Sequence, residues 1–361
     1  MKAKKNIIGA DLFAGAGGLS LGASMAGIDV RLAVEKDSYA AATYIHNHPQ
    51  TTMINNDIKK IKKIDIEIEK GSIKLLFGGP PCQGFSTSNQ RTRNKDNPSN
   101  WLFKEFIRIA KIWEPDWIVF ENVRGIVETE KGLFLNTITK SFEKAGYTCS
   151  WKVLNASDFG IPQTRSRFFL IASKHGHCIE LPENKAKTPI TVKQAIEDLP
   201  LLKNGANMDF MNYQGRPNSD YIKQLRGDLT GCTGHLVTRN SDLVLKRYNY
   251  IPAGGNWENI PEDLMQNYKD KNRCHTGIYH RLHPDFPSVT IGNYRKAMLI
   301  HPWENRGLSV REAARIQSFP DFYEFKGSIG FQQQQVSNAV PPLLARCVFE
   351  LLSKNIFNEG R

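Results

Sequence analysis

The residue best suited to covalent chemistry is a cysteine in LLFGGPPCQGFS, residues 75–86. An apolar run at residues 73–77 predicts a short buried strand, which two glycines and two prolines then end. Cys82 follows directly, on a stiffened loop at the carboxyl end of that strand, where open α/β sheets bind ligands. A buried structural cysteine is the alternative, because isolated cysteines are commonly core residues. The stretch alone leaves a nucleophile and a core residue as two open interpretations.

An acidic residue follows a neighbouring strand and could act together with the cysteine. Glu121, like Cys82, comes just past an apolar run that predicts a strand. A thiolate beside a carboxylic acid suits addition to a conjugated ring, because sulfur attacks carbon while the acid protonates a ring nitrogen. Downstream, IPQTRSRF supplies Gln163, Arg165 and Arg167, whose arginines could hold a phosphate or a base. A solvated strand edge is the alternative for this last stretch.

A glycine-rich turn, DLFAGAGGLSLG at residues 11–22, follows the first apolar run. Glycines at a strand-to-helix turn let the backbone approach a ligand closely. The fingerprint G-x-G-x-x-G is incomplete, because Gly15 and Gly17 fit but Ser20 takes the third place. Glu35 follows the loop at about the 20-residue spacing at which an acid binds ribose hydroxyls. These features predict an adenosine-containing cofactor; a plain tight turn with a solvated glutamate is the alternative.

These candidate residues need a scaffold of alternating strands and helices. Apolar runs that predict strands occur at residues 6–13, 29–35, 73–77, 117–120, 150–154 and 167–172, and segments with helical periodicity separate most of them. The alternation predicts an α/β fold with a doubly wound, mostly parallel sheet. From about residue 175 to about residue 308 Asn, Gly, Pro and isolated aromatic residues dominate, which predicts a second, irregular and strand-poor module.

Composition restricts the class of protein. The chain has 361 residues, 40% of them hydrophobic and 23% charged, as in ordinary globular proteins. No apolar run approaches the roughly 20 residues that span a bilayer, and no signal-peptide cleavage site follows the N-terminus, so we expect a cytoplasmic protein. Six scattered cysteines without CxxC pairs argue against zinc and against a disulfide framework, so no metal is expected. A net charge of +12 favours a polyanionic partner.

Taken in order, these stretches resemble the DNA cytosine-5 methyltransferases of the restriction–modification type. The resemblance covers nearly the whole chain apart from the middle of the irregular module. It implies the fold of S-adenosylmethionine-dependent methyltransferases with a smaller target-recognition domain. The implied domains are a catalytic domain at residues 1–180, a target-recognition domain with its hinge at 181–326 and a C-terminal return at 327–361. The matching stretches are DLFAGAGGLSLG, VEKD at 34–37, NDI at 56–58, GGPPCQGFS, ENVRG at 121–125, QTRSRFFLIA at 163–172, VREAARIQSFPD at 310–321 and QVSNAVPPLLA at 335–345.

The resemblance also implies residue roles. Cys82 is the expected nucleophile toward carbon 6 of cytosine, and Glu121 the acid at ring nitrogen 3, with Asn122 supporting the loop. Arg165 and Arg167 are the expected partners of the flipped base and its phosphate. Glu35 is expected at the ribose and Asp57 at the adenine amino group of S-adenosylmethionine. The expected cofactor-binding residues are Phe13, Gly15, Gly17, Gly18, Leu19, Glu35, Asp57, Pro81, Leu102, Asn338 and Val340.

The implied activity is methyl transfer to carbon 5 of a cytosine flipped out of a short, specific double-stranded DNA sequence, which would protect host DNA. We expect a monomer without an obligate partner protein or a membrane. An RNA cytosine methyltransferase on the same scaffold, a non-catalytic DNA-binding relative and a nucleotide-dependent oxidoreductase remain as alternatives. Expected DNA-contacting residues are Gln83, Ser86, Arg239, Arg273, Arg281, Asn293, Arg295 and Lys296.

Overall fold

The computed structural model describes residues 6–81, 101–183, 188–268 and 277–358, without the side chains of residues 296, 297 and 358. The chain divides into two compact units. The first unit comprises Met1–Asn155, Ser166–Lys185 and Pro342–Arg361. The second unit comprises Ala156–Arg165 and Ala186–Pro341.

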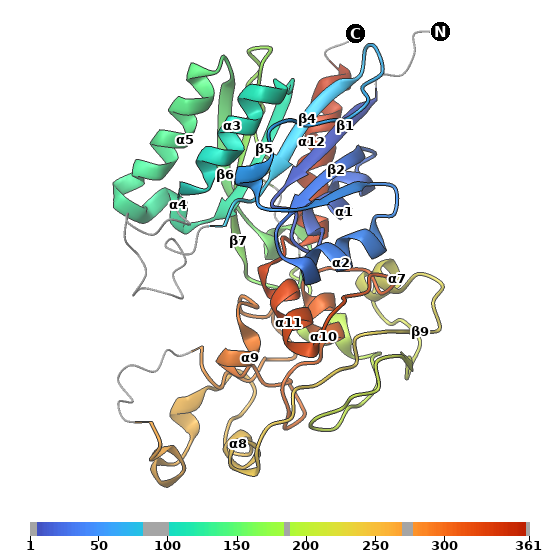
Figure 1. The fold of residues 1–361 in the computed structure, drawn as a ribbon. Coiled ribbons are helices and arrows are strands. Elements are labelled where there is room, and N and C mark those ends of the chain that lie inside the picture. The colour runs from blue at the N-terminus through green and yellow to red at the C-terminus, as the bar shows by residue number, and fades with distance from the viewer. Residues whose placement is uncertain (1–5, 82–100, 184–187, 269–276, 359–361) are drawn as a thin grey trace. The chain divides into compact units, whose positions relative to one another are not determined.

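A seven-stranded sheet forms the centre of the first unit, in the order β3-β2-β1-β4-β5-β7-β6 (Figure 1). Strands β1 to β5 pair in parallel, whereas β7 runs antiparallel to β5 and β6. The order reverses between β1 and β4, and such a switch point is where open sheets bind ligands. The predicted doubly wound, mostly parallel sheet is confirmed. The strands are β1 (Ile7–Leu12), β2 (Asp29–Glu35), β3 (Thr52–Asn55), β4 (Ile73–Gly78), β5 (Trp117–Val123), β6 (Thr148–Asn155) and β7 (Ser166–Ser173).

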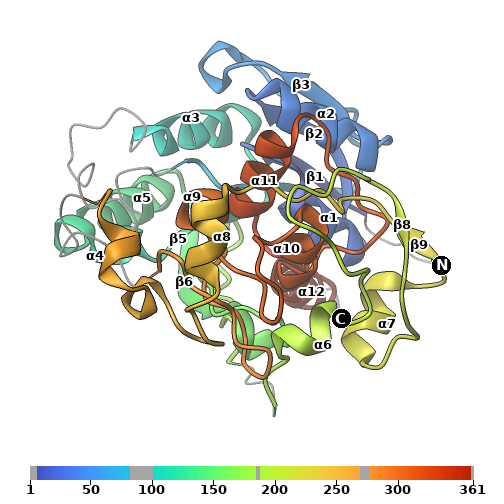
Figure 2. The ribbon, with the colours of Figure 1, turned by 90° about the horizontal axis from the view of Figure 1, so that it is seen from below.

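Helices cover both faces of this sheet (Figure 2). Side chains alternate along each strand, so that Leu76 and Phe120 join a core cluster with residues of α3 and α5. On the opposite face Phe77 packs edge-on against Phe349 of α12, with ring centroids 5.0 Å apart. The helices of the first unit are α1 (Gly18–Met25), α2 (Ser38–Asn47), α3 (Phe103–Trp113), α4 (Gly125–Glu128), α5 (Leu133–Lys144) and α12 (Pro342–Asn358), with 3-10 turns η1 (Ile58–Lys60) and η4 (Thr129–Gly132).

The C-terminal helix α12 packs directly on α1, the helix that follows the glycine-rich turn. Gly22 makes this approach possible, because a Cβ there would lie 2.5 Å from the Ala345 side chain and 2.7 Å from the Arg346 backbone nitrogen. Real Cβ atoms do not come that close, so the two helices meet backbone to backbone at this point.

The second unit is mostly irregular, as its composition predicts. Its two-stranded sheet pairs Met211 with Cys232 and Asn212 with Gly231. The remaining elements are short helices joined by loops. The strands of this sheet are β8 (Met211–Asn212) and β9 (Gly231–Cys232). The helices are α6 (Val192–Ile196), α7 (Asp220–Arg226), α8 (Asp242–Tyr248), α9 (Tyr294–Ala297), α10 (Val310–Ile316) and α11 (Ile329–Asn338), with 3-10 turns η5 (Ala156–Phe159), η6 (Trp257–Asn259) and η7 (Glu262–Met265).

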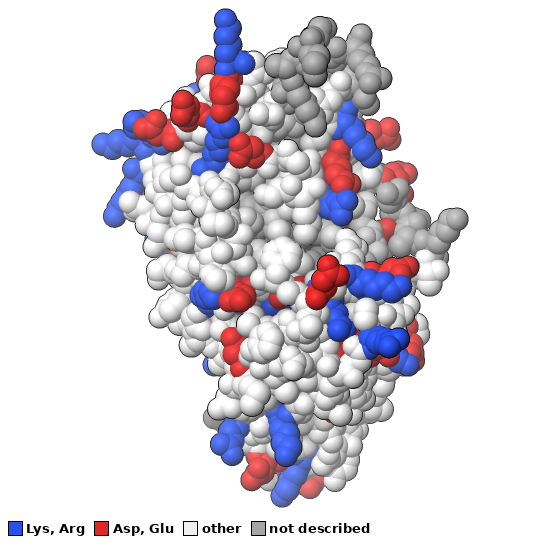
Figure 3. Space-filling view, turned by 90° about the vertical axis from the view of Figure 1, so that its right-hand side faces the viewer, with Lys and Arg blue, Asp and Glu red and all other residues white. Residues whose placement is uncertain are grey.

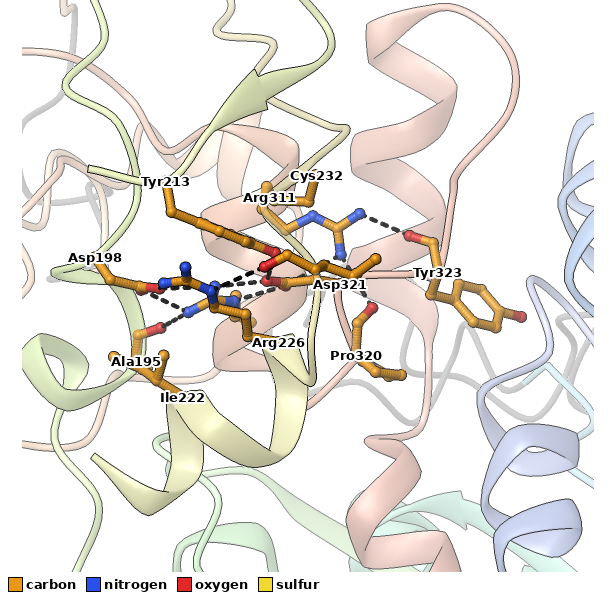
Figure 4. Close-up of polar contacts among 12 residues, drawn as sticks. Ala195, Asp198, Tyr213, Ile222, Arg226, Cys232, Arg311, Pro320, Asp321 and Tyr323 are labelled. Atoms are coloured by element: carbon orange, nitrogen blue, oxygen red, sulfur yellow. Dashed lines mark hydrogen bonds and ion pairs between the residues drawn. The ribbon is translucent and has the colours of Figure 1, made fainter. Parts of the chain in front are cut away.

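A buried network of ion pairs and hydrogen bonds joins α10 to neighbouring segments of this unit (Figure 4). Arg315 of α10 has no exposed surface and donates to Asp198 at 2.8 Å and to Asp321 at 2.6 Å. Asp321 also accepts from the Tyr213 hydroxyl at 2.6 Å, and Arg311 donates to the carbonyl of Tyr323 at 2.7 Å. Charge-assisted hydrogen bonds of this kind are strong and directional, so they hold α10 against loops that contain little regular structure.

The compact units have other limits than the expected domains, and the first unit continues to Lys185 and not to residue 180. Ala156–Arg165 clusters with the second unit, and the first unit resumes at Pro342 and not at residue 327. Helix α12 clusters with the first unit, whereas α11 clusters with the second unit and contacts α10. The chain therefore passes between the two units more often than the expected limits imply.

Candidate active site

The glycine-rich turn forms a tight bend between β1 and α1. Phe13 and Gly15 have positive φ angles of 61° and 55°, and Gly17 caps α1 with a φ of 90°. A non-glycine residue such as Phe13 in this region is uncommon and marks a constrained backbone, of the kind that clusters at ligand sites. Gly18 and Leu19 open α1 and are buried. The expected cofactor loop is thus a single bend at the carboxyl end of β1.

Glu35, at the end of the neighbouring strand β2, holds this bend in place. Its carboxylate accepts the backbone N–H of Gly15 at 2.8 Å and that of Asp37 at 2.7 Å. Burial raises the pKa of Glu35, and these backbone hydrogen bonds oppose the increase. Each carboxylate oxygen has a further lone pair, so the residue can still accept hydroxyl groups.

Asp57 follows β3 and already has a cationic neighbour. Its Oδ2 pairs with Lys36 Nζ at 2.9 Å, and its Oδ1 accepts the Lys59 N–H at 3.0 Å. The hydrogen bond from Lys36 contributes most to a lowered pKa of the Asp57 carboxyl. The Lys36 side chain is exposed and that of Asp57 is partly exposed, so this ion pair is accessible to solvent.

The acidic candidate Glu121 lies beside the loop that leads to Cys82. A side chain at Gly79 would collide with the Glu121 carboxylate, so the loop backbone passes directly over it. Asn122 donates from Nδ2 to the Pro80 carbonyl at 3.2 Å, which ties the end of β5 to the same loop. Pro81 is exposed, and Cys82, Gln83 and Ser86 lie outside the described residues.

Arg167 of β7 is the ionic partner of Glu121. Its Nε lies 3.0 Å from Glu121 Oε1, and the side chains of Arg167 and Glu121 are only 11% and 9% exposed. Burial lowers the pKa of Arg167, and the Glu121 carboxylate opposes that decrease. The pair forms because β5 and β7 are antiparallel neighbours, with Glu121 opposite Phe169 and Arg167 opposite Val123. Ion pairs this well buried orient both partners.

Arg165 has a different environment, in the second unit. Its guanidinium is 1% exposed and donates to the carbonyls of Ile291 at 2.9 Å, Ser337 at 2.8 Å and Ala339 at 2.9 Å. These bonds link the loop at Ile291 and the C-terminal end of α11 to the segment that precedes β7. Arg165 therefore has a structural role, which the sequence did not indicate, beside its expected role at the flipped base.

The other predicted site residues have varied positions. Leu102 immediately precedes α3 and packs against the core cluster of the first unit. Asn338 ends α11 and Val340 is buried in the second unit. Among the expected DNA-contacting residues, Arg239, Asn293 and Arg295 are exposed, Lys296 lies in α9 and its side chain is not described, and Arg273 is outside the described residues.

The expectation for Arg281 is wrong. Its side chain is buried, with five donor–acceptor bonds that include the carbonyls of Ile251 at 2.7 Å and Tyr248 at 2.8 Å. A guanidinium engaged in this way stabilises its own loops and has no donor directed to solvent for a base edge. Composition cannot distinguish a buried arginine from an exposed one.

Sequence reasoning missed the polar chain beneath the glycine-rich turn. Asp11, fully buried on β1, accepts from Ser20 Oγ at 2.7 Å, and Ser20 in turn accepts from the Tyr44 hydroxyl at 2.7 Å. Burial raises the pKa of Asp11. Within the described part of the chain, Asp11 Oδ1 has no hydrogen-bond partner. The signal was Ser20 itself, since a hydroxyl at the place of the third fingerprint glycine needs a partner.

For the described residues, neither surface charge nor membrane-spanning helices nor metal clusters indicate a further site. Figure 3 shows one face on which Lys and Arg are interspersed with Asp and Glu, without a continuous cationic surface among the described residues in view. No helix in the described ranges is long and apolar enough to cross a membrane. Among the same residues, no cluster of three His, Cys, Asp or Glu side chains could hold a metal ion.

Comparisons with known proteins identify the family of this chain. The sequence model of C-5 cytosine-specific DNA methylases matches residues 7–354. The type II methyltransferase M1.HphI of Haemophilus parahaemolyticus is 38% identical over 97% of this chain and 87% of the relative. M.DdeI of Desulfomicrobium norvegicum, also a type II methyltransferase, is 35% identical over 96% of this chain and 88% of the relative.

Solved structures give the same result. A prophage-encoded E. coli protein, described as a DNA modification methyltransferase, superimposes with a TM-score of 0.77 at 27% identity, over 98% of this chain and 100% of that one. Dnmt2 of S. pombe, at 16% identity and a TM-score of 0.56 over 98% and 99% of the two chains, supports the fold alone. The chain therefore belongs to the family of C-5 cytosine-specific DNA methylases and is a DNA (cytosine-5-)-methyltransferase.

Proposed function

We propose that this enzyme methylates carbon 5 of a cytosine flipped out of a short, specific DNA duplex, through a covalent adduct with Cys82, and that S-adenosylmethionine is the methyl donor. The observation that carries the proposal is the position of Glu121, which Arg167 orients at 3.0 Å beside the loop leading to Cys82. A buried acid held by a cation next to a cysteine loop suits ring addition, in which attack and protonation must coincide.

The residues around the glycine-rich turn fit S-adenosylmethionine, which would supply an electrophilic methyl group. Glu35 has lone pairs left for two ribose hydroxyls after it binds Gly15 and Asp37. Asp57 can accept an adenine amino group if Lys36 yields one oxygen. The unpartnered oxygen of buried Asp11 is a further sign of a polar ligand near this turn, since buried polar atoms normally have partners.

The chain's own groups would then act in sequence on cytosine. Glu121 would act in its protonated form, with Arg167 donating to the other carboxyl oxygen. The Cys82 thiolate adds to carbon 6 while Glu121 gives that proton to nitrogen 3, so that negative charge does not accumulate on the ring. Carbon 5 becomes an enamine carbon and accepts the methyl group. A base removes the proton from carbon 5, the Cys82 sulfur leaves as a thiolate while the double bond re-forms, and nitrogen 3 returns its proton to Glu121. Arg167 keeps Glu121 in position throughout.

The second unit would hold the duplex. The target base must leave the stack at a cost of a few kcal/mol, and protein contacts must compensate for that cost. Arg239, Asn293 and Arg295 are exposed candidates there for phosphate or base contacts. Because M1.HphI and M.DdeI are named type II methyltransferases, we include protection of host DNA in a restriction–modification system in the proposal.

A duplex with 5-fluorocytosine at the target tests the covalent step. Fluorine cannot leave as a cation, so elimination stalls after methyl transfer and the Cys82 sulfur stays bonded to the ring. The adduct should survive denaturing electrophoresis, require S-adenosylmethionine and disappear in Cys82→Ser, because a serine hydroxyl is not appreciably ionised at neutral pH.

Cys178→Ser is the matched control, since Cys178 is an exposed free cysteine outside the proposed site. It should trap as well as the unmodified enzyme. Trapping that persisted in Cys82→Ser would refute the proposed nucleophile. Trapping on 5-fluorocytosine tRNA but not on duplex DNA would favour the RNA alternative.

A further inference from the structure

Gln163 is a fully buried polar residue of the second unit, with a side chain that is 0% exposed. Its backbone runs beside a distant segment in a short parallel bridge to Ser288. The Thr164 N–H donates to the Ser288 carbonyl at 2.8 Å, and the Ser288 N–H donates to the Pro162 carbonyl at 2.9 Å. The backbone bonds align Gln163 with the start of the loop at residues 289–295.

The Gln163 amide joins this loop to the end of α10. Its Oε1 accepts the Ile291 N–H at 2.8 Å, and its Nε2 donates to Gln317 Oε1 at 3.0 Å. Gln317 extends this hydrogen-bonded chain to α11, because its Nε2 donates to the Val336 carbonyl at 2.8 Å. Rotating the Gln163 amide by half a turn would place an NH₂ group against the Ile291 N–H, so only one orientation satisfies both neighbours.

Ile291 is thereby held at both of its peptide groups. Gln163 takes its N–H, and Arg165 donates to its carbonyl at 2.9 Å. Ile291 is itself 0% exposed, and it anchors a loop in which the side chains of Thr290 and Asn293 are exposed, as is that of Arg295 in the adjoining helix α9. Exposed amide and guanidinium groups on an anchored loop are the groups that read base edges.

We infer that Gln163 is a positioning residue for target-sequence readout: through Ile291 it fixes the loop at residues 289–295, and it touches no substrate itself. This inference rests on the proposed function. Base-edge hydrogen bonds weaken steeply when distance or angle changes, whereas phosphate contacts tolerate displacement and carry no sequence information. A loosened anchor therefore lowers discrimination between sequences more than it lowers overall DNA affinity.

A random-sequence duplex library, methylated in vitro with S-adenosylmethionine and read by bisulfite sequencing, measures this discrimination. The readout is the methylation rate at the preferred site divided by that at sites with one altered base pair. Gln163→Met should lower this ratio about tenfold, the effect of one lost hydrogen-bond contribution. Affinity for S-adenosylhomocysteine, measured without DNA, should stay unchanged.

Gln332→Met is the matched control. Gln332 is also buried in the second unit, and it donates from Nε2 to the Gly327 carbonyl at 2.9 Å, a hydrogen bond that does not involve residues 289–295. It should lose thermal stability to a similar extent while its discrimination ratio stays the same. Equal ratios in Gln163→Met and Gln332→Met would overturn the inference, since Gln163 would then contribute only to folding.

Gln163→Glu supplies a second readout if the Met variant fails to fold. Burial raises the pKa of a carboxyl group, so the side chain is protonated at mildly acidic pH and can then reproduce the amide, with its hydroxyl donating to Gln317 Oε1. Discrimination should be restored at acidic pH and lost at basic pH, whereas the unmodified enzyme shows a flat ratio. A ratio independent of pH in this variant would also overturn the inference.

The same experiment separates a failure of the inference from a failure of the proposed function. If the unmodified enzyme leaves the library unmethylated, or methylates cytosines without sequence preference, the proposed function is refuted and the inference with it. If the unmodified enzyme shows a preferred site and the Gln163 variants keep the same ratio, only the inference is refuted.

Discussion

Substituting Glu35 tests the proposed cofactor site most directly, because this residue connects the glycine-rich turn with the predicted ribose position. Its carboxylate accepts the Gly15 N–H at 2.8 Å and the Asp37 N–H at 2.7 Å, and it is proposed to accept two ribose hydroxyls as well. Glu35→Ala removes all of these acceptors, whereas Glu35→Gln keeps one oxygen and turns an NH₂ group toward one of the two backbone donors.

The expected magnitude follows from the number of bonds. A hydrogen bond to a charged group contributes about 1.5–3 kcal/mol, so losing one ribose bond lowers affinity by roughly a factor of ten or more. Glu35→Ala should therefore weaken binding of S-adenosylmethionine at least about tenfold. Glu35→Gln should also weaken it, because the new NH₂ group would face either the Gly15 N–H or the Asp37 N–H, both of which the carboxylate accepts.

Isothermal titration calorimetry with S-adenosylmethionine and S-adenosylhomocysteine, in the absence of DNA, measures this effect. Glu105→Gln is the matched control, since Glu105 lies in the same unit and forms a partly buried ion pair with Arg108 of α3. Circular dichroism verifies that each variant is folded. A folded Glu35→Ala variant with unchanged cofactor affinity would remove Glu35 from the site.

The pKa of Glu35 gives an independent check on the same reasoning. Burial raises this pKa, so the carboxylate takes up a proton at a higher pH than an exposed glutamate does. Only the ionised form makes charge-assisted bonds to hydroxyls, so cofactor affinity should fall as pH decreases through the raised pKa. The fall should be absent in Glu35→Gln; an equal fall in both proteins would assign it to another group.

Three further outcomes are expected. Arg167→Met should lower kcat at least about tenfold with cofactor affinity unchanged in calorimetry, because it leaves the buried Glu121 carboxylate without its cation; wild-type turnover in steady-state assays would refute the role. Burial opposes ionisation of Glu312, but Arg306 outweighs it and lowers the pKa from 4.5 to about 2. Its stabilising contribution, about 3 kcal/mol, should be complete above pH 4.5, disappear between pH 4.5 and about 2 in acid unfolding, and be absent in Glu312→Gln. Duplex affinity should fall linearly with the logarithm of salt concentration, since a chain of net charge +12 releases counterions from DNA; a flat response in fluorescence anisotropy would contradict DNA binding.

Local sequence was sufficient for the scaffold of the first unit. Strand and helix periodicities depend on neighbouring residues, and the glycines of the turn after β1 allow the positive φ angles observed at Gly15 and Gly17. The family motifs, read in order, then indicated which residues follow which strands. Glu121 and Arg167 come near each other because β5 and β7 pair, which a strand pattern makes plausible but does not specify.

Only the tertiary structure decided what the polar residues bond to. Arg165 and Arg281 have the same residue type as the exposed Arg239 and Arg295, yet their donors go to backbone carbonyls. The acceptors of Arg165 lie 126 to 174 residues away in the sequence, so no local window contains them. A charged side chain can be buried only if hydrogen-bond partners surround it. For these arginines the partners are distant in the sequence and come together only when the chain folds.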